Sequence, residues 1–470
     1  MDVFSTLPPE LIAPILENLP DLRSLYSVTS SSPCVFHFMC SSMGVGVLES
    51  ILQSPFQDHP TTPWIPYILR VVALIRQCTS SKQPAANLTS FITTYIMPTT
   101  YQNARGEHVP DLQSCPPKCL PRIQLRDVIN RGPHAFLPRE MLFLAWRIDG
   151  LAARCFDFFH ERIKDTNPQH LPNKRPSVRQ PPWNVRTDSR PQGRPYAIDA
   201  GGQASWYEMQ RLCLGFWSLQ LCYELSNAAS EGRLAWSDAD VEAVRDMGSG
   251  MCLSGFEKSS LWVAREPLWA ALIYTRHLEG TLEDISCAGD TDRGLSGFYN
   301  TGFRPLEDRH LRLPSPRIGK GVWPPAMPSP PPFPCIDEQD AVTYHCHRVL
   351  VGCKGLRWAP HLLRPRSTPR LSDGLLFRPF RLLGFGIWDN ERLSAMEMLN
   401  DPTSNRPKRF ELWCPDQMFT WTSLLSQSQM GQLQRYQEEL ATRSEETEGV
   451  AGDASAIGDT PRAGYNDGVL

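Results

Sequence analysis

The stretch from residue 205 to residue 230 is the feature that most restricts how this chain can fold. If it is helical, large apolar side chains project from nearly every side of the helix, namely Trp206, Leu212, Leu214, Phe216, Trp217, Leu219, Leu221 and Tyr223. A helix that is apolar all round is stable in water only when other elements cover every side of it. The sequence therefore predicts a helix at the centre of a core, for which 41% hydrophobic and 10% aromatic residues supply enough material.

Helical patterns recur along the chain, whereas strand patterns are few. Residues 138–164 place apolar side chains near one helical stripe, and Ser237 is typical of a residue that begins a helix. Further helices are predicted at 267–279, 340–353 and 390–400, and the best strand candidate is 381–388. The predicted fold class is mainly α, with a short three-helix N-terminal module, an irregular helical body with long proline-rich loops, and a disordered C-terminal tail.

The 43 prolines are about 9% of the chain against a usual ~5%, so long connections without regular structure are expected. Stretches with few aliphatic residues cannot repay the entropy of ordering by burial. The predicted organisation is an N-terminal module at 1–50, helical body segments at 55–163, 204–313 and 335–429, a proline-rich basic linker at 164–203, a proline-rich linker at 314–334 and a disordered tail at 442–470. The sequence leaves open whether the body is one domain or two.

The first 40 residues predict three short helices. The first helix carries one apolar stripe, made of Leu11, Ile12, Ile15, Leu16 and Leu19. A second helix is expected after Pro20 and a third after Ser32, because each begins with a capping residue or a proline. Three helices of this length cannot bury all their apolar surface alone, so one face is expected to meet something else.

The run Leu7-Pro8-Pro9-Glu10-Leu11-Ile12, with the apolar positions up to Val28 that follow it, resembles the F-box. The Ser32-Pro33 start of the third helix makes the resemblance closer to the variety common at the start of fungal proteins. The likeness covers about 40 residues, which is under a tenth of the 470-residue chain.

The resemblance implies a function as a substrate receptor. F-box domains bind the Skp-family adaptor, which joins them to a cullin and a RING protein in an SCF-type ubiquitin ligase, and the rest of the chain recruits a protein substrate for degradation. The adaptor-binding residues that it implies here are Leu7, Pro8, Ile12, Ile15, Leu16, Leu19, Leu22 and Leu25. The chain would then be non-catalytic, with the chemistry performed by other subunits and the substrate unknown.

Two other interpretations stay open. The N-terminal residues could be the first helices of one all-α domain, or the chain could be a scaffold acting outside ubiquitination. A separate question is the role of residues 354–381, where seven basic residues stand with one acidic residue and aromatic residues lie between them. Such a stretch could bind an acidic partner through Arg357, Arg364, Arg366, Arg370 and Arg378, could bind nucleic acid, or could be a solvated basic surface.

Composition argues against several other functions. The 47 basic and 50 acidic residues leave a net charge of −3, which argues against a globally basic protein that binds nucleic acid over its whole surface. Cys115 with Cys119, and the cluster at 344–347 with Cys353, lack the spacing of a zinc site, so no metal and no cofactor are expected. Catalytic motifs are missing, and the longest apolar run, 65–75, is too short to span a bilayer. A location in the cytoplasm or nucleus is expected.

Overall fold

The computed structural model describes residues 2–53, 64–96, 100–102, 108–110, 121–129, 138–170, 193–246, 262–280, 312–314, 349, 379–399 and 415–426. These residues are mainly helical, which confirms the predicted fold class at that level. The chain divides into two compact units: unit 1 is 1–166, 198–356 and 380–404, and unit 2 is 167–197, 357–379 and 405–470.

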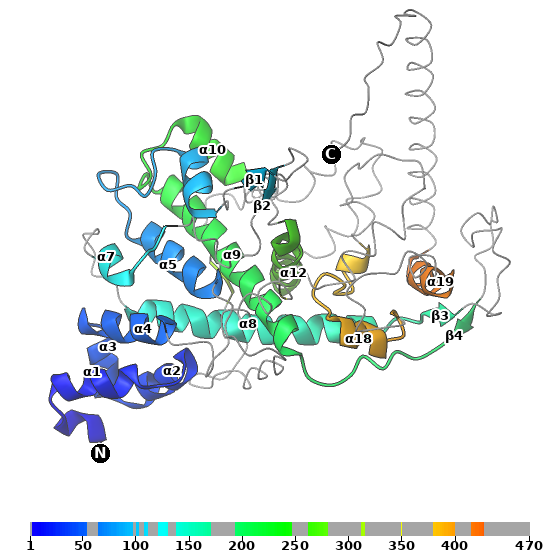
Figure 1. The fold of residues 1–470 in the computed structure, drawn as a ribbon, viewed down its shortest axis with the longest axis horizontal. Helices are drawn as coiled ribbons and strands as arrows, with labels where there is room; N and C mark the ends of the chain where they lie inside the picture. Colours follow the sequence, from blue (N-terminus) through cyan, green and yellow to red (C-terminus); the bar gives the residue numbers. More distant parts are fainter. Residues whose placement is uncertain are drawn as a thin grey trace, which may run out of the picture. The chain divides into compact units, whose positions relative to one another are not determined.

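The three predicted N-terminal helices are present. A 3₁₀ turn (η1, Val3–Thr6) precedes α1 (Pro9–Glu17), α2 (Leu22–Ser31) and α3 (Pro33–Met39), which appear in Figure 1 in the darkest blue. Proline occupies the first turn of α1 and of α3, where its missing N–H is not needed. The side chains of Asp21 and Ser32 accept hydrogen bonds from backbone N–H groups and begin α2 and α3 respectively.

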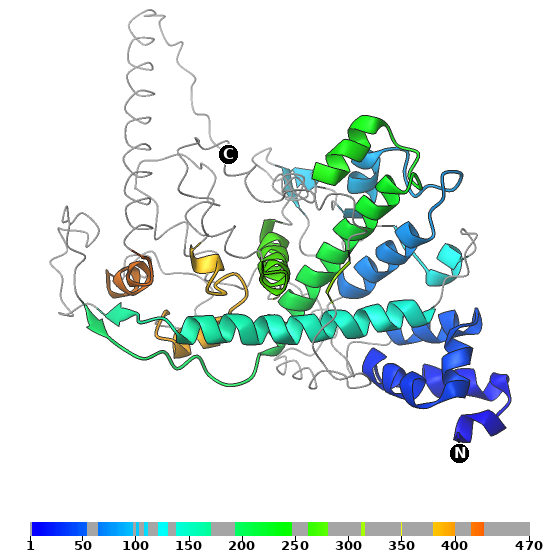
Figure 2. The same ribbon diagram turned by 180° about the vertical axis from the view of Figure 1, so that it is seen from behind.

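These helices continue into the body. Helix α4 (Met43–Gln53) packs against α1, while α2 lies against α8 (Pro138–Lys164), as Figure 2 shows. The contact is aromatic, because the Tyr26 ring stacks on Trp146 with centroids 5.4 Å apart and meets the edge of Phe143 at 5.0 Å. The N-terminal helices and the body therefore share one hydrophobic core within unit 1.

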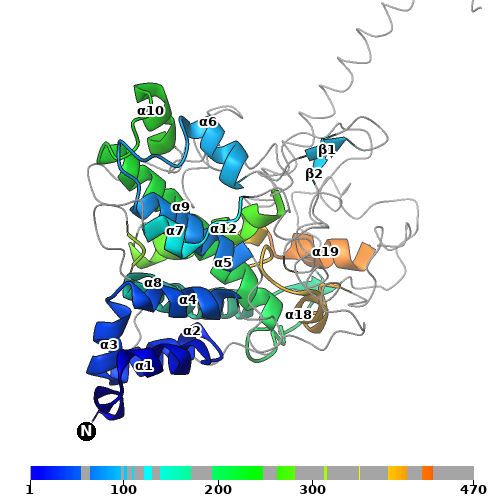
Figure 3. The ribbon, with the colours of Figure 1, turned by 60° about the vertical axis from the view of Figure 1, so that its left-hand side comes forward.

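The body is built round α9 (Trp206–Ser230), as its sequence predicts. Figures 1 and 3 show it among its neighbours, which are α5 (Trp64–Arg76), α8, α10 (Asp238–Asp246) and α12 (Trp262–Leu278). Nearly every residue of α9 is buried, and a capping box between Ser205 and Glu208 begins it. The helix predicted to begin at Pro267 begins five residues earlier, at Trp262, and Pro267 lies inside it.

A buried carboxylate joins three smaller elements of unit 1. Glu49 on α4 accepts hydrogen bonds from Arg70 on α5, at 2.6 Å, and from the backbone N–H of Leu125, which begins α7 (Leu125–Ile129). Helix α6 (Leu88–Phe91) and the π-helical turn η2 (Ile92–Ile96) follow α5, and β1 (Thr100–Gln102) pairs antiparallel with β2 (His108–Pro110).

Unit 2 contributes few described elements. Strand β3 (Gln169–His170) pairs antiparallel with β4 (Arg194–Pro195), and α19 (Pro415–Ser423) packs on β3. The Ser423 hydroxyl accepts a hydrogen bond of 2.8 Å from the Gln169 N–H. Both ends of the predicted linker 164–203 thus have a defined backbone.

The predicted strand 381–388 is wrong. Arg381 ends a helical turn, and the chain then makes tight turns to Trp388 before α18 (Asn390–Ala395), which is shorter than the predicted helix 390–400. The turns need Gly384, whose φ is +81° and where a Cβ atom would come within 2.6 Å of the Trp388 ring. Of the predicted helix 340–353 only Val349 is among the described residues, and it is helical.

We expect Asp2→Asn to loosen the start of α3. The Asp2 carboxylate accepts hydrogen bonds from the Cys34 N–H at 3.1 Å and the Ser32 hydroxyl at 2.8 Å, and the Cys34 bond is the largest cause of its lowered pKa. A carboxyl whose pKa is lowered by folding stabilises the folded chain above its unfolded pKa, and this contribution is lost as pH falls through the folded pKa. Hydrogen-exchange protection of the Cys34 and Val35 amides should therefore fall in the variant at pH 7.

The same comparison at a pH low enough to protonate the Asp2 carboxyl in the folded chain should show little difference between variant and wild type. Glu161→Gln, which removes an exposed carboxylate from α8, is the matched control and should leave these amides unchanged. Equal protection of the Cys34 amide in wild type and Asp2→Asn at pH 7 would contradict the assigned role of Asp2.

Candidate functional site

Exposed apolar side chains are concentrated at the N-terminal end of the chain. Among the residues whose exposure the structure describes, the large apolar side chains that are exposed are Val3, Leu11, Met43 and Ile15, at 73, 52, 44 and 43%. All four belong to η1, α1 or the first residue of α4. Single exposed apolar residues are normal on a protein surface, but their concentration on neighbouring short helices marks a candidate contact surface.

Helix α1 is apolar on two sides. Ile12 and Leu16 are 2% and 0% exposed and face the core of the N-terminal helices. Leu11 and Ile15 lie four residues apart, so they share the other side of the helix, together with the exposed Pro14. We name Leu11, Pro14 and Ile15 the outer face of α1.

Helix packing and hydrogen bonds support the outer face from behind. Helix α1 packs on α4, and η1 is tied to α3 through the Asp2 carboxylate and the Ser32 hydroxyl. Pro14 leaves the helix continuous, and its carbonyl accepts hydrogen bonds from both the backbone and the side chain of Asn18. Exposed Glu10 and Glu17 flank the apolar positions, which gives the polar rim typical of a contact surface.

The eight adaptor-binding residues that the F-box resemblance implies differ in their exposure to solvent. Pro8 and Ile15 are exposed, and Leu7, Leu19 and Leu22 are half-buried. Ile12, Leu16 and Leu25 lie in the core of the unbound chain, so in this conformation they support the helices from within. The implied set lacks Leu11, although the four-residue spacing from Leu11 to Ile15 is visible in the sequence.

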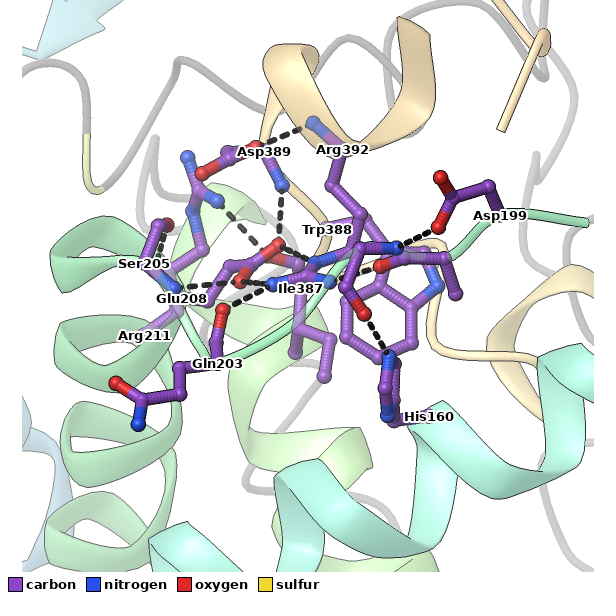
Figure 4. Close-up of polar contacts among 12 residues, drawn as sticks. His160, Asp199, Gln203, Ser205, Glu208, Arg211, Ile387, Trp388, Asp389 and Arg392 are labelled. Atoms are coloured by element: carbon purple, nitrogen blue, oxygen red, sulfur yellow. Dashed lines mark hydrogen bonds and ion pairs between the residues drawn. The ribbon is translucent and has the colours of Figure 1, made fainter. Parts of the chain in front are cut away.

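A cluster of polar residues lies deep inside the body, at the start of α9. Figure 4 shows Glu208 on α9 facing Arg392 on α18, with hydrogen bonds of 2.7 Å and 2.9 Å from the guanidinium to the carboxylate. The remaining guanidinium N–H groups reach the carbonyls of Ala200 and Gln203. Arg392 also lies over the rings of Phe156 and Trp388, at 4.9 Å and 5.5 Å from their centroids.

The neighbours of this pair complete the cluster, which we call the α9 clasp: His160, Ala200, Gly201, Gln203, Ser205, Glu208, Arg211, Ile387, Asp389 and Arg392. Glu208 also accepts bonds from the backbone of Ser205 and Asp389, and Arg211 donates to the carbonyls of Val349 and Ile387. Burial, and then the Asp389 carboxylate, raise the pKa of Glu208, while Arg392 opposes the rise.

The clasp connects three parts of the chain that are far apart in the sequence. His160 on α8 donates to the Gly201 carbonyl at 2.9 Å, so α8, the 199–205 loop, α9 and the 387–392 segment all meet there. Both oxygens of Glu208 accept more than one bond, and the charge is paired. An ion pair enclosed and satisfied in this way holds segments together; it does not present a group to a ligand.

The basic stretch is only partly described. Arg357, Arg364, Arg366, Arg370 and Arg378 lie outside the described residues, so their predicted role in binding an acidic partner stays a prediction. Arg381 does not belong to a binding surface, because it is 8% exposed and pairs with Glu266 at 2.5 Å and 2.6 Å. A count of basic residues cannot show which of them has a buried acid opposite it.

Within the described residues, no three His, Cys, Asp or Glu side chains are grouped as they would be round a metal ion. Cys115, Cys119 and the 344–347 cluster lie outside that part of the chain. No single described helix has the length and apolar composition needed to cross a membrane; α3 and α4, bent by 88°, satisfy the criteria only as a pair.

Comparisons of this chain with protein-family models, with curated proteins and with solved structures find no match.

We expect Glu208→Gln to destabilise unit 1 by about 3 kcal/mol, because it leaves the Arg392 charge buried without its carboxylate. Urea unfolding followed by tryptophan fluorescence measures the loss. Adding Arg392→Met should recover part of it, since the uncompensated charge is then gone. Glu242→Gln on the exposed side of α10 is the control and should change stability little. Equal stability of Glu208→Gln and this control would contradict the role of the clasp.

Proposed function

We propose that this chain is an F-box-type substrate receptor: its N-terminal helices bind the Skp-family adaptor of an SCF-type ubiquitin ligase, and its body recruits a protein substrate. The observation that carries the proposal is the outer face of α1. It presents Leu11 and Ile15, 52% and 43% exposed, within the stretch whose sequence resembles the F-box.

The exposed area of these side chains determines how much free energy a partner would gain by covering them. Fully burying a leucine or isoleucine contributes roughly 1.5–3 kcal/mol. Leu11 and Ile15 are about half exposed, so covering both would supply roughly 1.5–3 kcal/mol from two positions one helical turn apart. The half-buried Leu7, Leu19 and Leu22 are available to widen such a contact.

The packing of the N-terminal helices on the body is compatible with this role. Tyr26 of α2 makes the contact with α8, whereas Leu11 and Ile15 of α1 remain exposed when that contact is formed. The adaptor would therefore bind without separating the helices from the body. In this proposal the chain holds the substrate, and the ubiquitin-transfer chemistry belongs to the cullin–RING part of the ligase.

We expect Leu11→Asp with Ile15→Asp to abolish adaptor binding, because adaptor contact would bury two unpaired charges. The test is co-expression of the full chain with a Skp-family adaptor, followed by size-exclusion chromatography with light scattering. Wild type should give a one-to-one complex. The double variant should elute as a folded monomer, since both side chains already face water in the free chain.

Ala86→Asp with Thr89→Asp is the matched control, because it adds the same two charges at exposed positions before and within α6. This control should retain the complex at wild-type yield. Retention of the complex by the α1 double variant would show that the outer face does not bind the adaptor. A folded wild-type chain that ignores the adaptor would remove the proposed function itself.

A further inference from the structure

Arg147, near the middle of α8, has an unusual environment for a half-buried guanidinium. Its Nε atom is buried and has no hydrogen-bond partner within the described residues. Its Nη1 atom approaches the Leu313 carbonyl at 3.5 Å, which is at the outer limit for a hydrogen bond. A guanidinium carries five N–H donors, so the described residues satisfy only a small part of its donor capacity.

The charges of the described residues that act on Arg147 are positive. Burial is the largest cause of its lowered pKa, followed by the charges of Arg76 and Arg312. Arg312 is exposed and directly precedes Leu313, whose carbonyl Arg147 reaches. Arg76 ends α5 and pairs with Glu224 of α9 at 2.5 Å. A guanidinium remains protonated at neutral pH even with a lowered pKa, so three cations from three segments are gathered here.

Three other arginines of unit 1 that are largely shielded from solvent lie opposite a carboxylate, whereas the buried Arg211 donates to backbone carbonyls. Arg392 faces Glu208, Arg381 faces Glu266 and Arg70 faces Glu49, each within 2.7 Å. Within the part of the chain that the structure describes, the charges that act on Arg147 are instead the cations Arg76 and Arg312. A buried charge that meets only like charges is unfavourable unless an anion completes the site.

We propose that Arg76, Arg147 and Arg312 form a binding site for a phosphate dianion, either free or carried by a phosphorylated side chain. Three guanidinium charges less the one carboxylate of Glu224 leave a local charge of +2. Phosphate groups carry about −1.5 to −2 charges at pH 7, whereas a carboxylate carries one, so phosphate matches the site better. The planar N–H array of arginine suits phosphate oxygens. This site does not depend on the proposed adaptor binding.

The experiment is a thermal-unfolding titration of the full chain at constant ionic strength, with sodium phosphate replacing sodium chloride. A second titration uses phosphoserine with blocked amino and carboxyl ends. A saturable rise of the unfolding midpoint is expected with at least one probe. A response to phosphate alone indicates a free anion as the ligand, and a stronger response to the phosphoserine derivative indicates a phosphorylated side chain.

Two variants test the assignment of the site. Arg147→Met should unfold at the same temperature as wild type or higher without phosphate, and should lose the phosphate response, because it removes an unpaired charge and keeps the volume. Arg312→Gln, at an exposed position, should weaken binding roughly three- to tenfold. Arg154→Gln, on an exposed part of the same helix, should respond as wild type does.

Three results would overturn the proposal. The first is no saturable response of wild type to either probe, as expected if an acidic side chain of this chain already fills the site. The second is a wild-type response that persists in Arg147→Met. The third is an unchanged response in Arg312→Gln, which remains informative even if Arg147→Met does not fold.

Discussion

The ion pair between Glu208 and Arg392 is the interaction on which the arrangement of unit 1 depends. Helix α9 is buried on nearly all sides, yet Glu208 and Arg211 lie within it. A buried charge is tolerated only when a partner and hydrogen bonds replace the lost water. Arg392 and the backbone of the 387–389 and 199–205 segments provide that replacement. The polar residues of α9 thereby determine which distant segments must pack against its first turns.

Much of the helical framework could be predicted from the sequence, because a repeat of 3.6 residues is a local signal. Helices α8 and α9 begin and end within a residue of their predicted positions, and Ser205 and Ser237 act as caps. The turns at 382–388 and the α9 clasp could not be predicted. Hydrogen bonds join them to residues as far as 220 positions away, and composition alone did not distinguish the buried Arg381 from an exposed arginine.

The candidate site was predicted in outline but not residue by residue. The apolar stripe of α1 was visible, yet a stripe does not reveal which members face inward. Ile12 and Leu16 turned out to support the helix, while Leu11 and Ile15 are exposed. The division follows from packing against α4, a helix beginning at Met43 that the three-helix prediction did not include. Arg147, which has no carboxylate partner among the described residues, left no sequence signal either, because its surroundings come from three separate segments.

The continuous helix α8 fixes the distance between the N-terminal helices and the α9 clasp. The Tyr26 stack meets α8 at Trp146 and the clasp meets it at His160, 14 positions further on. At 1.5 Å per residue these points are about 21 Å apart along a continuous helix. A protein bound to the outside of α1 would therefore be held at a fixed distance and angle from the far end of the body. The orientation of any protein bound to that body would then be set by a continuous helix and not by a flexible linker.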